Sequence, residues 1–317
     1  MRFSGARRPY GVAFKQPTNV RAKGIMQVHK STDPPTAWTN CWGANFDWNG
    51  WLRPGLDIVA SLGCTAVKIS PPVRALATGG ATAALAGDRL RRYCDYAATK
   101  GLNLYWSLSY NQSDATTLTT TQRSTAAVAL ATVANEYPTF GIDLFNEPDA
   151  IGATSQANVA AYASVVFPAV RAVTRIPLTI SLSGLPVQWA GHPYLSTISP
   201  YVDFYDWHTY VTGANLVPTI PADLTAWRAS SSFKPYALGE AGNPLVTGSG
   251  FTGGSGFQTT VYNAIGQIGA QPDCLGVFAF CLTDYDGSQF GFLDETLNSA
   301  VLRSQITGPF ASWIGTR

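Results

Sequence analysis

The chain has 317 residues, of which 46% are hydrophobic, and this is enough for one large core. Only 13% of the residues are charged and the formal net charge is +2, without a basic stripe, so nucleic acid is not an expected partner. No stretch reaches the roughly 20 apolar residues of a membrane span, and we expect none.

The N-terminal residues and the cysteines set two further expectations. Residues 1–23 have no apolar period and are predicted to be an extension before a domain over 24–317. They lack the apolar run of a signal peptide, so either the chain is not Sec-exported or a signal was removed before this numbering. The five cysteines form no CxxC and lie far from histidine in sequence, which argues against a metal site. Free, mostly buried thiols are expected, with one or two unassigned disulfides as the alternative.

From residue 24 onward, short apolar runs of strand length alternate with helical patterns. The runs cover 24–29, 65–70, 102–107, 140–145, 178–183, 202–208, 236–240 and 275–282. The helices between them are predicted over 54–62, 82–100, 121–137, 156–174, 222–230, 256–269 and 297–305. Gly63 and Gly101 are placed to end the first two helices, and Pro168 is placed to kink or break the fourth. After the fifth run, residues 186–199 predict only a short or irregular helix.

Eight such alternations predict an α/β fold, a single (β/α)8 TIM barrel. An open, doubly wound sheet is the alternative, but its usual Gly-rich phosphate turn is missing after the first run, which continues into Val28-His29-Lys30-Ser31.

Two glutamates stand where such a barrel places its active site, at the C-terminal ends of strands. Glu147 follows the fourth run in Asn146-Glu147-Pro148, and Glu240 ends the seventh in Gly239-Glu240. Facing carboxylates at the barrel mouth can hydrolyse an acetal, one as proton donor and one as nucleophile, with retention when they lie about 5–5.5 Å apart. A lone strand-end glutamate is more often solvated or salt-bridged, so the argument depends on the pair.

Together with His208-Thr209-Tyr210 at the end of the sixth run, these motifs resemble glycoside hydrolase clan A, the retaining barrels that include cellulase-like enzymes. The resemblance extends over roughly residues 24–305 and is most specific at the fourth and seventh runs. It implies that Glu147 is the acid/base, Glu240 the nucleophile and Asn146 a ligand of the substrate 2-hydroxyl. It also implies that Tyr210 orients Glu240 and that His208 lines the floor of the site. No cofactor is implied. For His208, a satisfied core histidine is the alternative.

The sequence departs from the clan at two places. Lys68 stands on the second run where an arginine is common, and the eighth run has no tryptophan, so Phe280 is the candidate floor for the sugar, with Asp284 nearby. Asp143 alternates with Phe145 and Glu147 and should point into the barrel, where a buried Asp needs partners. We therefore expect Lys68 and Asp143 to share one polar network beneath the site.

Aromatic residues supply the remaining candidates for sugar binding, because indole rings stack on the apolar face of a sugar. The long segment 30–53 carries Trp42 and Trp48, and Trp189 follows the fifth run. Some of these rings are alternatively expected simply to pack onto the barrel.

The sequence therefore predicts a retaining O-glycosyl hydrolase that acts on a poly- or oligosaccharide. A carbohydrate-binding barrel without turnover, a transglycosylase and a virion-associated glycan-adhesion protein remain as alternatives. The composition fits activity outside the cell or on a phage particle.

Overall fold

The protein is described by a computed structural model, which covers residues 21–27, 42–43, 46–108, 117–150, 155–210, 220–245, 254–284, 289–294, 297 and 302–313. Residues 1–20 of the predicted extension 1–23 and much of segment 30–53 therefore lie outside the described residues. No helix within these ranges is both long and apolar enough to cross a bilayer.

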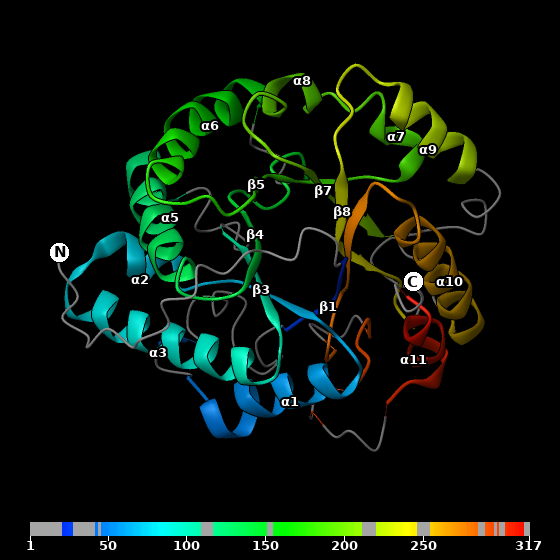
Figure 1. Cartoon of the computed structure of the whole chain (residues 1–317), viewed down its shortest axis with the longest axis horizontal. Coiled ribbons are helices and arrows are strands. Elements are labelled where there is room, and N and C mark those ends of the chain that lie inside the picture. The colour runs from blue at the N-terminus through cyan, green and yellow to red at the C-terminus, as the bar shows by residue number, and fades with distance from the viewer. Residues whose placement is uncertain are drawn as a thin grey trace.

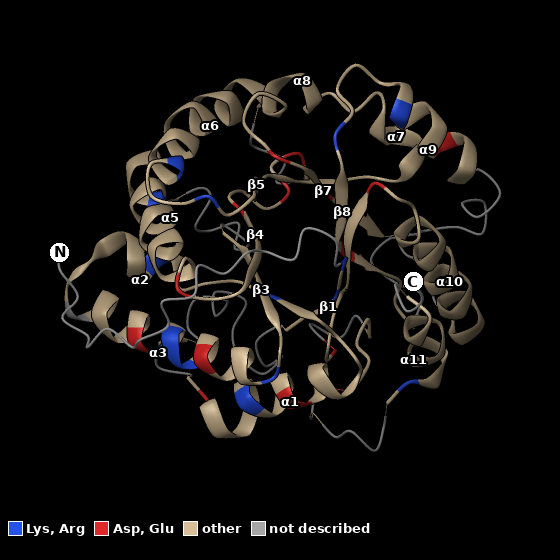
Figure 2. Cartoon of the chain, viewed as in Figure 1, with Lys and Arg blue, Asp and Glu red and all other residues tan. Residues whose placement is uncertain are grey.

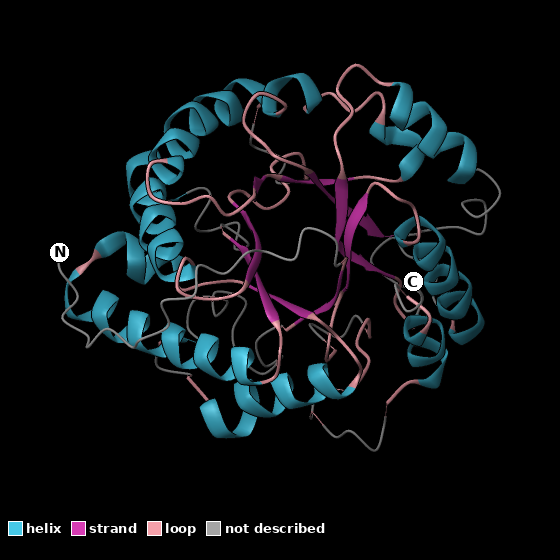
Figure 3. Cartoon of the chain, in the orientation of Figure 1, coloured by secondary structure: helices cyan, strands magenta, loops and turns pink. Residues whose placement is uncertain are grey.

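The strands form a ring that is surrounded by helices, as Figures 1 and 3 show. The strands are β1 (Ala22–Met26), β2 (Ala66–Ile69), β3 (Asn103–Ser107), β4 (Thr139–Asp143), β5 (Leu178–Thr179), β6 (Ser181–Ser183), β7 (Tyr205–Tyr210), β8 (Tyr236–Gly242) and β9 (Cys274–Ala279). All neighbouring strands pair in parallel in the order β5-β4-β3-β2-β1-β9-β8-β7-β6. β5 and β6 are two parts of the predicted fifth strand, so this strand closes the ring and the single TIM barrel is confirmed.

Helices follow most strands on the outside of the ring. They are α1 (Arg53–Ser61), α2 (Val73–Thr78), α3 (Gly80–Thr99), α5 (Thr120–Ala134), α6 (Gln156–Arg171), α7 (Pro186–Trp189), α8 (Leu195–Ile198), α9 (Ile220–Ala229), α10 (Ser255–Gly269) and α11 (Ser304–Ala311), with a π-helical turn η3 (Trp48–Leu52) before α1. Local chemistry sets several ends: Thr119 and Gln122 form a capping box at α5. Gly63 and Gly101, both with φ of 71°, follow α1 and α3 as predicted.

Several predicted boundaries were wrong. β1 begins at Ala22 instead of residue 24, and α2 was not predicted. Pro168 does not break α6, which continues to Arg171. The last helix begins at Ser304 and not at residue 297, because Arg303 has an extended backbone and its guanidinium binds Asp284.

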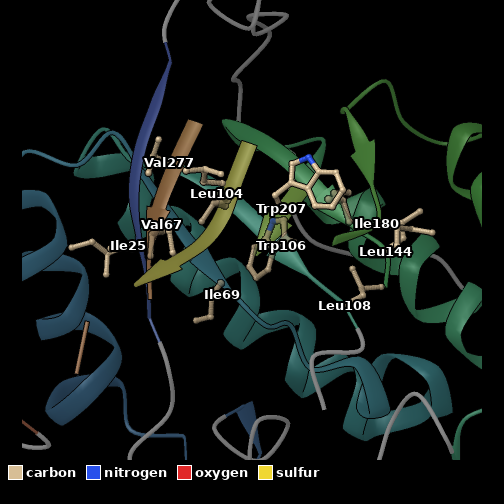
Figure 4. Close-up of a cluster of buried hydrophobic side chains, with 14 of the residues drawn as sticks. Ile25, Val67, Ile69, Leu104, Trp106, Leu108, Leu144, Ile180, Trp207 and Val277 are labelled. Atoms are coloured by element: carbon tan, nitrogen blue, oxygen red, sulfur yellow. The ribbon is translucent and has the colours of Figure 1, made fainter. Parts of the chain in front are cut away.

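The outer faces of the strands make the main hydrophobic core with the helices, and Figure 4 shows part of it. Trp207 of β7 is fully buried, stacks on Trp189 of α7 at 5.0 Å between ring centroids and meets Trp227 of α9 edge-on. Loss of such a ring costs about 3–5 kcal/mol. Four cysteines, Cys64, Cys94, Cys274 and Cys281, are free and buried as expected, and Cys41 lies outside the described residues.

The inside of the barrel is filled in layers. Tyr105, Phe140, Phe204 and Phe278 make a cluster of aromatic rings with centroids 5.0 to 6.4 Å apart. The Tyr105 hydroxyl extends from this cluster to Asp206, where a polar layer begins. This aromatic cluster fills the interior of the barrel, which is therefore a packed core. The polar side chains next to it line the bottom of the opening at the C-terminal ends of the strands.

Candidate active site

The loop after β4 presents Glu147 in an unusual backbone conformation. Its φ is 40°, in the left-handed region that costs a non-glycine residue about 1–3 kcal/mol. Neighbouring strands hold it there: Glu147 N donates to Ser181 Oγ at 3.1 Å, and Asn146 N donates to the Leu108 carbonyl at 3.2 Å. The side chain of this strained residue reaches the mouth of the barrel and is 21% exposed.

A bulge between β7 and β8 presents Glu240. Trp207 pairs with Leu238 but His208 pairs with Glu240, so the register skips Gly239. A Cβ atom on Gly239 would lie 1.9 Å from Asp206 Oδ1, hence only glycine permits this close approach. Bulges of this kind turn a side chain next to an active site.

The structure brings the two predicted glutamates together. One carboxylate oxygen of Glu147, one of Glu240 and a ring nitrogen of His208 all lie within 4.8 Å of one another. This spacing resembles the roughly 5–5.5 Å of retaining glycosidases and is shorter than the roughly 6.5–9.5 Å of inverting ones.

Glu240 is almost completely buried, with a hydroxyl group at one carboxylate oxygen and an ammonium group at the other. The Tyr210 hydroxyl donates to its Oε2 at 2.6 Å, and Lys68 Nζ lies 3.2 Å from its Oε1. Phe280 packs edge-on against the Tyr210 ring and so lies beside the site. Charge-assisted bonds to a carboxylate favour its ionised form.

Glu147 has a different partner, His208. His208 Nδ1 lies 2.7 Å from Glu147 Oε1, and the other ring nitrogen, Nε2, lies 2.8 Å from Lys68 Nζ. The histidine therefore contacts the acid/base candidate on one side and the buried lysine on the other.

Lys68 and Asp143 belong to one buried network, but Lys68 does not pair with Asp143 directly. Its carboxylate partners are Asp206, at 3.5 Å, and Glu240. Asp143 Oδ2 instead accepts hydrogen bonds from Ser107 Oγ at 2.7 Å and Ser181 Oγ at 2.9 Å. The Lys68 and Asp143 ends of the network are adjacent, because one oxygen each of Asp143 and Asp206 and a ring nitrogen of His208 lie within 4.8 Å of one another.

The buried charges shift one another's pKa values. Burial and, to a smaller extent, the charge of Asp206 raise the pKa of Asp143 to about 6, although Lys68 opposes this. Burial also acts to raise the pKa of Asp206, but the Lys68 ammonium beside it opposes burial, and that pKa is lowered to about 2. Asp206 is therefore ionised at neutral pH.

The acidic groups and His208 have the donor atoms of a metal site, yet the buried Lys68 ammonium already supplies a positive charge among them. Lys68 therefore offsets part of the negative charge of this cluster. Figure 2 shows charged positions along the strands and loops of the ring as well as on the outer helices.

Four predicted binding residues are engaged elsewhere. Trp42 and Trp189 are at most 1% exposed and donate to the carbonyls of Ser70 and Gly184, and Trp48 is 8% exposed beneath Arg92 of α3. These rings pack onto the barrel wall, which was the alternative expectation. Both Asp284 oxygens accept from Arg303 at 2.6 Å, so Asp284 ties the end of β9 to the start of α11.

Sequence reasoning missed Asp206, Ser107 and Ser181. The signal for Asp206 was present, because residues 206, 208 and 210 alternate on one face of β7 and the two others had been singled out. No sequence signal distinguished the two serines, which become partners of Asp143 and Asn146 only when β3, β4 and β6 are neighbours.

No family model and no curated protein matches the sequence. Solved structures of similar fold include a GH5_18 protein from Streptomyces cattleya in complex with GlcNAc, with a TM-score of 0.71 and 17% identity over 94% of this chain and 82% of that one. The exo-β-1,4-mannosidase Op5Man5 from Opitutaceae bacterium strain TAV5 has a TM-score of 0.68 and 19% identity over 93% of this chain, which spans 59% of the mannosidase. A family 1 β-glucosidase from Thermotoga maritima in complex with isofagomine lactam has a TM-score of 0.64 and 12% identity, over 92% and 97% of the two chains. The protein thus has the barrel fold of glycosidases, in agreement with the resemblance to clan A.

Proposed function

We propose that the protein is a retaining glycoside hydrolase. The observation that supports this most directly is the carboxylate pair at the barrel mouth, with oxygens of Glu147 and Glu240 within 4.8 Å of each other. The environments of the two groups differ in the way the reaction requires. Glu240 is buried against a lysine and a tyrosine hydroxyl, which favour the carboxylate, while Glu147 faces solvent and has one hydrogen-bond partner in His208.

The two steps follow from these positions. In the first, Glu147 gives its proton to the glycosidic oxygen as the C1–O bond breaks, and a Glu240 oxygen bonds to C1. In the second, Glu147 takes a proton from water as the water oxygen bonds to C1, and Glu240 leaves as the carboxylate. Each glutamate returns to its starting state, so no further reactant is needed.

Asn146 is placed to bind the substrate. Its side chain lies beside Ser107 and Ser181, with Oδ1 3.1 Å from Ser107 Oγ and 3.5 Å from Ser181 Oγ, and its NH₂ group would donate to the sugar 2-hydroxyl. His208 lines the floor below, and Phe280 supports Tyr210 from the side.

The proposed substrate is an O-glycosidic bond of an oligo- or polysaccharide. Proteins of similar fold are named as a β-1,4-mannosidase and a β-glucosidase, and one was solved with GlcNAc, so β-mannosides, β-glucosides and β-N-acetylglucosaminides are the first substrates to test. Transfer to a second sugar would use the same intermediate, and product analysis with added acceptor separates it from hydrolysis.

The test is a panel of 4-nitrophenyl β-glycosides of these three sugars with the unmodified chain, Glu240→Gln and a matched control, Glu136→Gln. Glu136 follows α5, is 49% exposed and pairs with Arg91 on the surface. We expect turnover with at least one sugar, loss of more than about 1,000-fold in Glu240→Gln, and little change in the control. A 2-deoxy-2-fluoro glycosyl fluoride of the active sugar should label Glu240, as detected by peptide mass.

Sugar binding without turnover on any member of the panel would favour the non-catalytic carbohydrate-binding barrel. Equal turnover by the unmodified chain and Glu240→Gln would reject the proposed nucleophile.

A further inference from the structure

The Lys68 ammonium has as many acceptors as it has protons to donate. An ammonium group carries three N–H donors and accepts nothing. Nζ lies 2.8 Å from His208 Nε2, 3.2 Å from Glu240 Oε1 and 3.5 Å from Asp206 Oδ2, and the side chain is completely buried. One of its N–H groups therefore points at His208 Nε2, which must offer its lone pair.

Only one proton can lie between Lys68 Nζ and His208 Nε2, because one of the two nitrogens must accept it. Burial opposes the charge on each group, and the carboxylates raise both pKa values; that of His208 is raised to about 10, although Lys68 acts to lower it. Two protonated nitrogens nevertheless cannot face each other at 2.8 Å, because neither has a lone pair to accept the proton of the other. The ordinary pKa of an amine is about 4 units above that of an imidazole, so Lys68 keeps the proton and His208 is neutral.

A neutral His208 with an unprotonated Nε2 carries its proton on Nδ1. That nitrogen lies 2.7 Å from Glu147 Oε1, so it donates to this oxygen whether Glu147 is protonated or ionised. When Glu147 is protonated, its proton therefore lies on the other oxygen, Oε2.

We propose that Lys68 is a positioning residue for both glutamates: it binds Glu240 directly, and through the tautomer of His208 it assigns the catalytic proton of Glu147 to Oε2. This inference rests on the proposed function for its catalytic meaning, but the tautomer itself does not depend on it. During the first step the Oε2 proton passes to the leaving oxygen, and the Nδ1–H group then stabilises the new carboxylate. No proton leaves the Lys68–His208 pair.

Other charged and titratable groups face this pair and enter its pH dependence. They are Tyr105 of β3, Asp143 of β4, Glu147 of the following loop, Asp206 and Tyr210 of β7, and Glu240 of β8. Among them, burial raises the pKa of Asp143 to about 6, so its titration is measured separately in Asp143→Asn.

The direct test is the ¹⁵N NMR spectrum of the imidazoles. The chain has three histidines, and the His208 signals are those lost in His208→Asn. We expect Nδ1 protonated and Nε2 unprotonated between about pH 5 and 8, the range in which an ordinary imidazole titrates. In Lys68→Met the ammonium no longer opposes a second proton, so Nε2 should gain one while the carboxylates remain. Lys68→Arg, which also only donates, should keep the unmodified pattern. A doubly protonated His208 in the unmodified chain, or identical spectra in Lys68→Met, would overturn the proposal.

Activity gives a second readout. An imidazolium beside Glu147 favours its carboxylate, so the basic limb of kcat/KM should move down by about one to three pH units in Lys68→Met. Lys100→Met, which removes an exposed lysine that pairs with Asp57, should leave the profile unchanged. If Lys68→Met lowered kcat/KM by the same factor at every pH, Lys68 would have only a structural role, and the positioning role would be overturned. If the unmodified chain cleaves no glycoside, the proposed function fails, whereas the NMR result still decides the tautomer.

Discussion

Replacement of Gly239 by alanine should disrupt the bulge that presents Glu240. An added Cβ would lie 1.9 Å from Asp206 Oδ1, 2.2 Å from Oδ2 and 2.3 Å from Cγ. Separations below 3.0 Å essentially never occur for a real Cβ, so either Asp206 or the backbone of β8 must move. Asp206 is completely buried and is held by Lys68 and Tyr105, so a displacement would weaken both of these contacts.

The expected cost follows from this geometry. Overpacking a core costs about 1–3 kcal/mol, and disturbance of a buried ion pair adds to it, so we expect about 3 kcal/mol or more. For a chain of this size each kcal/mol lowers Tm by roughly 2–4 °C, which gives a decrease of roughly 6 °C or more. Activity should fall further than stability, because Lys68 also contacts Glu240.

Thermal and urea unfolding of Gly239→Ala would measure the effect, with Gly191→Ala as the matched control. A Cβ on Gly191 meets no heavy atom within 4 Å, and Gly191 is not among the glycines with positive φ, so its replacement should change the free energy of unfolding by less than about 1 kcal/mol. If Gly239→Ala were as stable and as active as Gly191→Ala, the argument that only glycine fits against Asp206 would be refuted.

Three further predictions concern single groups of the site. Glu147→Ala should lose far less kcat on aryl glycosides with good leaving groups than on natural glycans, because only the latter need its proton; equal losses would count against the assignment. Tyr210→Phe removes the 2.6 Å bond to Glu240, worth about 1.5–3 kcal/mol, so kcat/KM should fall roughly 10- to 100-fold, and an unchanged value would contradict the role. The folded-state pKa of Asp206, about 2, lies below the unfolded value of about 3.9, so its ionised form stabilises the protein above about pH 4 and this contribution is lost towards pH 2. Urea unfolding across that range should show a shallower acid decline in Asp206→Asn, and parallel curves would contradict the shift.

The barrel could be predicted because its signals are local and repeated. Each strand is a short apolar run, and the glycines after α1 and α3 mark helix ends that depend on backbone conformation at one position. The start of α11 could not be predicted in this way. Arg303 stays outside the helix because it binds Asp284, which is distant in sequence, and helical propensity contains no such information.

The role of the aromatic candidates could not be predicted from the sequence either. An indole is equally suited to stack on a sugar or to fill a core, and the sequence does not tell which surface it meets. Trp42, Trp48 and Trp189 turned out to be packed against the barrel, because neighbouring helices and strands cover them.

The sequence by itself determined the repeat of strands and helices, and with it the edge of the barrel at which Glu147 and Glu240 must emerge. Only the tertiary structure decided the partners of these glutamates: His208 for one, Lys68 and Tyr210 for the other, with Asp206 beneath. The physical reason is the separation along the chain of the residues that interact. Strand period and helix ends depend on residues a few positions apart, whereas the charge balance of a buried cluster depends on distances between side chains of different strands.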